Sequence, residues 1–466
     1  MAMLRRFLSA TFAFPVVLSA QTATTRDLTP LVNRVFARWD STTAPGCAVG
    51  IDRAGSPRFA RAFGSADLEH GIPNGPETIF ESGSIAKQFT AAATVLLALD
   101  GKLDLEDDVR KYVPELPAYE KPVTIRHLLN HTSGLRDWGD IASIAGWPRG
   151  SRVHTHDHVL DILDQQRALN YPPGERYSYT NSGYNLLAII VSRVSGQSFA
   201  DFSRERIFRP LGLTSTQWRD DYRRIVKGRA QAYARADGGG WELEMPFENV
   251  HGNGGLLTTV GDLLSWTAML EKPTPAWKAM VDSLHVRGRL TNGDTITYAL
   301  GLVVSDYRGV SRVEHSGATA GYRAELLRFP GRGLAIAVLC NAASAVPTRY
   351  ASQLVDSLLA PALGPVVANS QGPVSDTTML IAPAELAAYA GTYFSPDAET
   401  TLEVSVANDA LTLLRRPTTR ITLRQTSTDT FSGFGQRVWF TRDASGRVTA
   451  LHVRTGRAYD VVFERR

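Results

Sequence analysis

A serine and a lysine three residues apart open a long apolar run. Ser84-Ile85-Ala86-Lys87 begins a stretch rich in Ala, Val and Leu that extends to Leu99. On a helix, residues at i and i+3 share one face, so the lysine amine can reach the serine hydroxyl. A desolvated lysine loses its proton more readily and can act as a base, and a helix N-terminus favours an oxyanion. The pair predicts a nucleophile, Ser84, that Lys87 activates.

A second candidate segment has the pattern Tyr-x-Asn, from Tyr179 to Asn181. It precedes an apolar helix expected over residues 184–195. A phenol beside Ser84 and Lys87 would relay a proton to the leaving group. Asn181 can accept a hydrogen bond from the lysine and donate one to a substrate carbonyl. The structural alternative is that Tyr179 belongs to the core and that Asn181 only caps the helix.

The third candidate segment, His315-Ser316-Gly317, ends a strand-like run. A glycine there allows a substrate backbone to approach the strand edge, and an extended peptide can pair with such an edge. His315 is expected to hydrogen-bond Tyr179 or a substrate carboxylate and to tune the charge of the site. The alternative is a packed histidine without a chemical role.

The three segments together carry a resemblance to a known family. Ser-x-x-Lys, Tyr-x-Asn and His-Ser-Gly each occur once, in the order typical of serine β-lactamases and penicillin-binding proteins. The chain resembles the β-lactamase-related serine hydrolases of class C type, a group with β-lactamases, D-alanyl-D-alanine carboxypeptidases, D-aminopeptidases and esterases. The likeness covers residues 28–360. It includes the stretches around the second and third segments, 172–187 and 315–330, and two further stretches, 125–135 and 254–263.

The resemblance implies roles for particular residues and also shows departures. It implies an oxyanion hole formed by the backbone N–H groups of Ser84 and Ala318, and a structural turn at His131-Thr132-Ser133-Gly134. Neither Lys-Thr-Gly nor Lys-Ser-Gly occurs, and a histidine in that place resembles the peptidase and esterase branches. Glu-x-x-x-Asn is also absent, so Tyr179 would have to help activate the water that releases the acyl group.

The elements that must position these residues form an α+β pattern. Strand-like runs at 46–63 and 298–340 enclose a mostly helical stretch, 102–290, and an amphipathic helix is expected at 347–360. One antiparallel sheet should therefore gather both ends of a β-lactamase-like domain, 28–362.

The C-terminal region has a different texture. Residues 363–382 are rich in Gly, Pro and small polar residues and are interpreted as a linker. Evenly spaced strands over 383–466 predict a small antiparallel β-barrel of about eight strands. The region resembles the lipocalin-like domain appended to some peptidases of the group, which implies restricted access to the active site or oligomerisation through the barrel. Arg323 could face a substrate carboxylate, although an exposed strand position is favoured.

Composition and the N-terminus bear on location and partners. The chain has 43% hydrophobic and 21% charged residues and a net charge of +4, without a Lys/Arg run, which argues against nucleic-acid binding. Residues 1–20 combine Arg5 and Arg6 with a short apolar stretch and a small-residue end, so they predict a signal peptide and export to the periplasm or medium. An uncleaved anchor is the alternative; the stretch is short for one, and no stable membrane insertion is expected.

The two cysteines and the reaction leave alternatives open. Cys47 and Cys340 do not indicate a metal site; two buried free thiols are favoured over a disulfide. Nothing indicates a metal or organic cofactor.

The preferred function is a secreted serine hydrolase that forms an acyl-enzyme on small peptides or amides, including those with D-amino acids, or on esters. The alternatives are a class C-like β-lactamase and a penicillin-binding sensor that acylates without turnover. A purely structural relative is disfavoured, since no catalytic position is lost.

Overall fold

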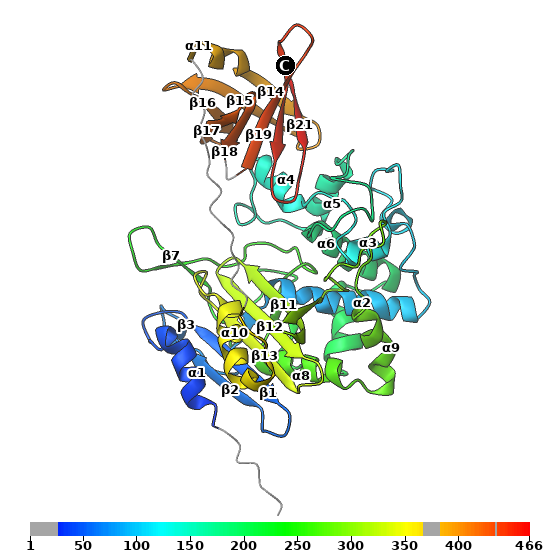
Figure 1. Cartoon of the computed structure of the whole chain (residues 1–466), viewed down its shortest axis with the longest axis vertical. Coiled ribbons are helices and arrows are strands. Elements are labelled where there is room, and N and C mark those ends of the chain that lie inside the picture. Colours follow the sequence, from blue (N-terminus) through cyan, green and yellow to red (C-terminus); the bar gives the residue numbers. More distant parts are fainter. Residues whose placement is uncertain (1–26, 367–382, 434–435) are drawn as a thin grey trace, which may run out of the picture.

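A six-stranded antiparallel sheet lies at the centre of the larger part of the molecule (Figure 1). The computed structural model describes residues 27–366, 383–433 and 436–466. The strands follow the order β10-β11-β12-β13-β1-β2, so the two ends of this part meet in one sheet, as the α+β prediction requires. They are β1 (Cys47–Arg53), β2 (Phe59–Phe63), β10 (Val303–Tyr307), β11 (Val310–Thr319), β12 (Tyr322–Phe329) and β13 (Leu334–Cys340).

Helices cover both faces of this sheet. On one face, α1 (Thr29–Phe36) and α10 (Pro347–Leu358) bury Phe36 and Leu354 in one cluster with Val49 and Ile336. On the other face, α8 (Val260–Glu271) packs against β1 and β13. The side chain of Thr259 caps α8 by accepting the N–H of Asp262.

The helical region is built around α2 (Ala86–Leu99), whose residues 86–97 are all buried. The other helices of this part are α3 (Ile125–Leu129), α4 (Trp138–Ile144), α5 (His156–Asp164), α6 (Asn181–Ser195), α7 (Phe199–Ser203), α9 (Pro275–Leu284) and the short η1 (Ala37–Trp39), η2 (Gly83–Ile85), η3 (Val109–Lys111), η4 (Arg204–Phe208) and η5 (Ala360–Ala362). Its short strands are β3 (Ser65–Asp67), β4 (Ile72–Pro73), β5 (Phe80–Glu81), β6 (Gln217–Trp218), β7 (Tyr233–Arg235), β8 (Trp241–Leu243) and β9 (Leu256–Thr258).

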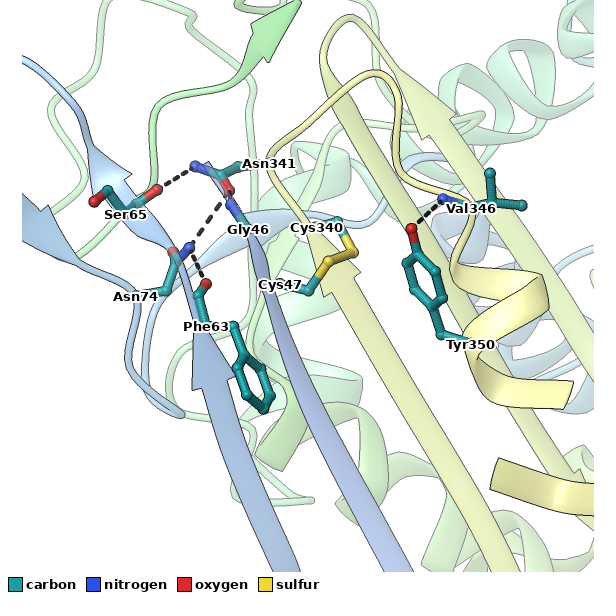
Figure 2. The surroundings of a disulfide bond; sticks show 9 residues. All are labelled: Gly46, Cys47, Phe63, Ser65, Asn74, Cys340, Asn341, Val346 and Tyr350. Atoms are coloured by element: carbon teal, nitrogen blue, oxygen red, sulfur yellow. Dashed lines mark hydrogen bonds between the residues drawn. A yellow bond between two sulfur atoms is a disulfide. The ribbon is translucent and has the colours of Figure 1, made fainter. Parts of the chain in front are cut away.

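A disulfide joins Cys47 of β1 to Cys340 of β13 (Figure 2). The favoured prediction of two buried free thiols is therefore wrong. The two residues are direct partners in the antiparallel register, with Cα atoms 4.0 Å apart, so their side chains meet on one face of the sheet. Asn341, next in the chain, accepts the N–H of Gly46 at 2.8 Å and donates to the carbonyl of Ser65 at 2.9 Å, which ties the same strand ends together.

The C-terminal region forms a closed antiparallel barrel of eight strands, as predicted. Its interior is filled by large side chains, among them Tyr393, Leu413, Phe440 and Phe463. The barrel follows α11 (Pro383–Leu386) and η6 (Ala387–Tyr389) and consists of β14 (Gly391–Ser395), β15 (Thr400–Ala407), β16 (Ala410–Arg415), β17 (Thr419–Ser427), β18 (Thr430–Gly433), β19 (Gln436–Arg442), β20 (Val448–Arg454) and β21 (Val461–Arg465).

The barrel packs on the helical region next to α4 (Figure 1). Ile141 and Ile144 of α4 belong to the same buried cluster as the barrel core. The Arg136 guanidinium, only 4% exposed, pairs with Asp397 of the barrel. An apolar contact and a buried ion pair thus hold the barrel against the segment that precedes α4.

Two sequence predictions fall wholly or largely outside the described residues. These are the signal peptide, 1–20, and the linker, of which only residues 363–366 are described. Among the described residues, no helix is long and apolar enough to cross a membrane.

Candidate active site

Ser84 and Lys87 are in contact, as their spacing predicts. Ser84 lies in η2, between β5 and α2, so α2 begins two residues after Ser84 and not at it. The Lys87 Nζ lies 3.1 Å from the Ser84 Oγ. Ser84 is half-buried, whereas the Lys87 side chain is fully buried. The hydroxyl can therefore meet a substrate while the amine behind it is shielded from water.

The other two contacts of Lys87 leave its lone pair for Ser84 once the amine is neutral. Its Nζ donates to the Asn181 Oδ1 at 3.0 Å and to the backbone carbonyl of Asn253 at 2.7 Å. Both oxygens can only accept, so a neutral amine spends its two protons on them and turns its lone pair to the Ser84 hydroxyl. Burial lowers the pKa of Lys87 well below its usual value, and the Arg457 guanidinium lowers it further. The arrangement favours a lysine that takes a proton from Ser84.

Asn253 is a site residue that sequence reasoning missed. Its backbone carbonyl is held in place because its side-chain Oδ1 accepts a hydrogen bond from Asn185 of α6 at 2.8 Å. Gly252 has a φ of +95°, and a Cβ there would lie 2.6 Å from the Cβ of Ala188. The glycine-rich stretch around Asn253 was a signal that the backbone comes close to another element.

Tyr179 lies against Lys87, as predicted. The Lys87 Nζ is 4.7 Å from the centre of the Tyr179 ring. The Tyr179 hydroxyl is buried and has no hydrogen-bond partner among the described residues. Burial raises the pKa of Tyr179, although the nearby Ser84 hydroxyl and the Arg457 guanidinium oppose that rise. The phenol therefore keeps its proton at neutral pH and is free to share it with a group near Ser84.

His131 supports this tyrosine, in keeping with the structural role implied for its turn. Its ring centre lies 4.2 Å from that of Tyr179, and its Nδ1 accepts the N–H of Thr180 at 3.2 Å. Burial lowers the pKa of His131 well below its usual value, so the ring is neutral and can accept this bond.

Asn181 is the first residue of α6 and not its cap. The cap is Thr180, whose hydroxyl accepts the N–H of Ser182 at 3.3 Å. The Asp137 Oδ2 accepts the backbone N–H of Asn181 at 2.7 Å. The Asn181 side chain is thereby left free to face Lys87, and the alternative that Asn181 caps the helix is wrong.

His315 is placed in the site but not in the predicted contact. Its Nε2 lies 3.0 Å from the Tyr298 hydroxyl and its Nδ1 lies 2.7 Å from the carbonyl of Ser316. Among the described residues, His315 makes no hydrogen bond to Tyr179, because its Nε2 is bonded to the Tyr298 hydroxyl instead. Burial and the nearby Lys87 lower the pKa of His315 to about 4. The ring is neutral at pH 7 and brings no charge for a substrate carboxylate.

Gly317 has a packing role that was not predicted from the sequence, in addition to its place on the strand edge. A Cβ at this position would lie 2.0 Å from the carbonyl oxygen of Ser82, and one at Gly83 would lie 2.5 Å from the backbone nitrogen of Ala318. The two glycines let β11 lie against the backbone that carries Ser84. Because neither glycine has a side chain, the backbones of Ser84 and Ala318 can lie close together. An oxyanion hole formed by their two N–H groups needs this closeness.

A cleft of about 520 Å³ lies in front of Lys87, and it is lined by Ser84, Tyr179, Asn181, Asn253 and residues 315–319. Because β10 pairs with β11 only as far as Glu314, residues 315–319 form a strand edge along η2 and the cleft. The cleft also holds three arginines: Arg149, Arg323 and Arg457. Arg323 is half-buried in this lining, so the favoured prediction of an exposed strand residue is wrong. Arg457 comes from the barrel and was not singled out in the sequence.

Comparison with known proteins identifies the family. Residues 31–360 match the sequence family described as Beta-lactamase. The chain belongs to the Beta-lactamase family. Residues 378–465 match a second family, described as a domain of unknown function (DUF3471). The lipocalin resemblance of the barrel therefore stays a prediction.

Relatives within the Beta-lactamase family carry names of hydrolases and penicillin-binding proteins. The chain is 30% identical over 373 residues to penicillin-binding protein 4* of Bacillus subtilis, covering 76% of this chain and 80% of that protein. It is 28% identical to the D-aminopeptidase of Gluconobacter oxydans, over 68% of this chain and 59% of that protein. The family and these relatives make the chain a serine hydrolase.

Solved structures confirm the β-lactamase/transpeptidase-like fold. The octameric penicillin-binding protein homologue from Pyrococcus abyssi aligns with a TM-score of 0.63 and 24% identity, over 94% of this chain and 99% of that one. The D-amino acid amidase from Ochrobactrum anthropi SV3 aligns with a TM-score of 0.61 and 22% identity, over 72% of this chain and 99% of that one. The alignment with the first structure extends over the C-terminal barrel.

Proposed function

We propose that this serine hydrolase cleaves small peptides or amides, including those with D-amino acids, through an acyl-enzyme on Ser84. The observation that carries the proposal is the Lys87 amine, buried, 3.1 Å from the Ser84 Oγ and bound to two oxygens that only accept. The name D-aminopeptidase of one relative supports the substrate class.

The proposed reaction starts when the Ser84 hydroxyl gives its proton to Lys87 and its oxygen attacks the substrate carbonyl carbon. The backbone N–H groups of Ser84 and Ala318 hold the negative oxygen of the tetrahedral intermediate. The carbon–nitrogen bond then breaks, the proton passes by way of Tyr179 to the leaving amine, and the acyl group stays on Ser84. Water, deprotonated by the same pair, attacks the ester and releases the acid, and Ser84 regains its proton.

A second candidate is acylation by β-lactams, with or without turnover. The name of the relative from Bacillus subtilis favours it. Against efficient turnover stands His315, which occupies the place of the usual lysine and is neutral, since its pKa lies at about 4.

Hydrolysis of three substrates by the full chain separates these functions. The substrates are D-phenylalanine amide, p-nitrophenyl acetate and nitrocefin, each with Ser84→Ala as the blank. Ser84-dependent release of ammonia from the amide supports the proposal. Hydrolysis of nitrocefin but of neither other substrate would indicate a β-lactamase. A stable adduct of nitrocefin with Ser84, without turnover, would indicate a penicillin-binding sensor.

Export to the periplasm or medium is part of the proposal. The N-terminal sequence supports it, and so does the disulfide between Cys47 and Cys340, since disulfides persist in oxidising compartments. Association of several copies through the barrel is a further proposal. Size-exclusion chromatography with light scattering of the full chain tests it, and the mass of a single chain would contradict it.

A further inference from the structure

The turn between β20 and β21 carries a barrel residue into the catalytic cleft. This turn, 455–460, is closed by the hydrogen bond from the backbone N–H of Thr455 to the carbonyl of Ala458 at 2.7 Å. Arg457 lies at its tip, and its side chain lines the cleft together with Ser84 and Tyr179. A residue more than 270 positions from Tyr179 in the chain thus forms part of the same site.

The turn is fixed on the hydrolase part by backbone and side-chain contacts. The backbone N–H of Arg457 donates to the Asp140 Oδ2 at 3.0 Å, and its carbonyl accepts the N–H of Asp137 at 3.2 Å. Two residues on, the Tyr459 hydroxyl bonds the Ser178 Oγ at 2.9 Å, one residue before Tyr179. The backbone at the tip is therefore held whatever side chain stands at position 457.

The Arg457 guanidinium is both accessible and only weakly paired. The side chain is 41% exposed, and its Nη1 is 3.8 Å from the Asp137 Oδ2, beyond hydrogen-bond distance. That carboxylate oxygen already accepts the N–H of Asn181 at 2.7 Å. The guanidinium lies over Tyr179, with its carbon 5.1 Å from the ring centre. Its donors remain free for a ligand in the cleft.

The other cations of the cleft are engaged. Arg149 is bound by Glu248, with its Nε donating to the Oε2 at 2.9 Å. Arg323 donates from its Nη1 to the carbonyls of Ala320 at 2.6 Å and Tyr322 at 2.7 Å. Of the three arginines, Arg457 is the one whose guanidinium makes no hydrogen bond among the described residues, and it is the one in contact with a proposed catalytic residue.

We propose that Arg457 binds a carboxylate on the leaving-group side of the substrate, so that the barrel supplies a specificity-determining residue to the active site. The inference rests on the proposed function, since Tyr179 is the residue that passes the proton to the leaving amine there. Arginine matches a carboxylate with two parallel hydrogen bonds. Among peptide substrates, the favoured one is therefore a short peptide whose leaving residue ends in a free carboxylate rather than in an amide or ester.

Binding to a variant without the nucleophile tests this inference apart from turnover. The full chain with Ser84→Ala is titrated by calorimetry with N-acetyl-D-alanyl-D-alanine and with its C-terminal amide, two probes of nearly equal shape that differ in charge. We expect the acid to bind about tenfold more tightly than the amide, in the range of a charge-assisted hydrogen bond that is partly exposed to solvent. In Ser84→Ala with Arg457→Ala, this ratio should fall to about one, and Arg457→Lys should restore part of it.

Arg420→Ala, an exposed arginine on the barrel strand β17, is the matched control and should keep the ratio. Equal binding of the acid and the amide to Ser84→Ala would overturn the inference, and so would a preference that survives Arg457→Ala. Wild-type hydrolysis of the substrates named above reports separately on the proposed function, so the two failures are distinct.

Discussion

Gly317 of β11 lies so close to Ser82 that a Cβ at position 317 would be 2.0 Å from the Ser82 carbonyl oxygen. This approach sets the distance between the strand edge and the nucleophile, because Ser82 lies two residues before Ser84. Gly317→Ala should push β11 away from η2 and lower kcat/KM by at least about 100-fold, the scale of losing one oxyanion donor. Steady-state kinetics measures this loss. Gly261→Ala is the control, since a Cβ there meets its nearest neighbour at 3.7 Å; equal activity of both variants would refute the argument.

Removing the base should be nearly as harmful as removing the nucleophile. We expect Lys87→Ala to lower kcat by at least about 10³-fold, the scale of losing a general base. Lys111→Ala, an exposed lysine paired with Asp107, serves as the control. A Lys87→Ala variant within tenfold of wild type would mean that another group takes the Ser84 proton.

The pH dependence should report on Lys87 and on Arg457. The neutral amine is the active form, so kcat/KM should rise as the pH increases through the pKa of Lys87. The Arg457 charge disfavours the protonated amine and so lowers the pKa of Lys87. Arg457→Gln should therefore raise that pKa and move the acid limb of the profile to higher pH. The profile is measured with a neutral substrate. An acid limb that stays at the same pH, or moves to lower pH, would show that Arg457 does not act on Lys87.

A buried carboxyl group in the sheet should make stability depend on pH. Both carboxyl oxygens of Glu325 in β12 are buried and have no hydrogen-bond partner among the described residues. Burial raises the pKa of Glu325 well above its usual value, and the nearby Glu314 adds to the rise. The folded state thus holds a proton that the unfolded state loses above its ordinary pKa, so the Glu325 contribution to stability falls as the pH rises.

Glu325→Gln removes this dependence because an amide does not titrate. Its Tm should exceed that of the wild type at pH 8 by more than it does at pH 4. Glu403→Gln, an exposed barrel position, should show no such difference between the two pH values. A wild-type Tm equal to that of Glu325→Gln at both pH values would contradict the assigned protonation.

Local spacing was sufficient to predict some of the site. Ser84 and Lys87 lie within one helical turn, and Tyr179 and Asn181 lie at the start of α6, so the motif and the element that holds it are adjacent in sequence. The sheet and the barrel were also predictable, because alternation and turn residues recur along their strands.

Contacts between distant segments were not predictable from such patterns. The carbonyl of Asn253, 166 positions away in the chain, accepts a hydrogen bond from Lys87. Tyr298 is hydrogen-bonded to the His315 ring, which was expected to bond Tyr179. Cys47 and Cys340 pair only because β1 and β13 are neighbours in the sheet. Arg457 enters the cleft because the barrel docks beside α4, and no feature near Arg457 in the sequence marks that docking.

The most direct test of the account is to locate the acyl group. The full chain is mixed with p-nitrophenyl acetate at neutral pH and quenched with acid, and its intact mass and peptide masses are measured for the wild type and for Ser84→Ala. The account predicts one acetyl group on the peptide that contains Ser84 in the wild type and none in the variant. An acetyl group at another residue, or an equal amount on Ser84→Ala, would contradict it.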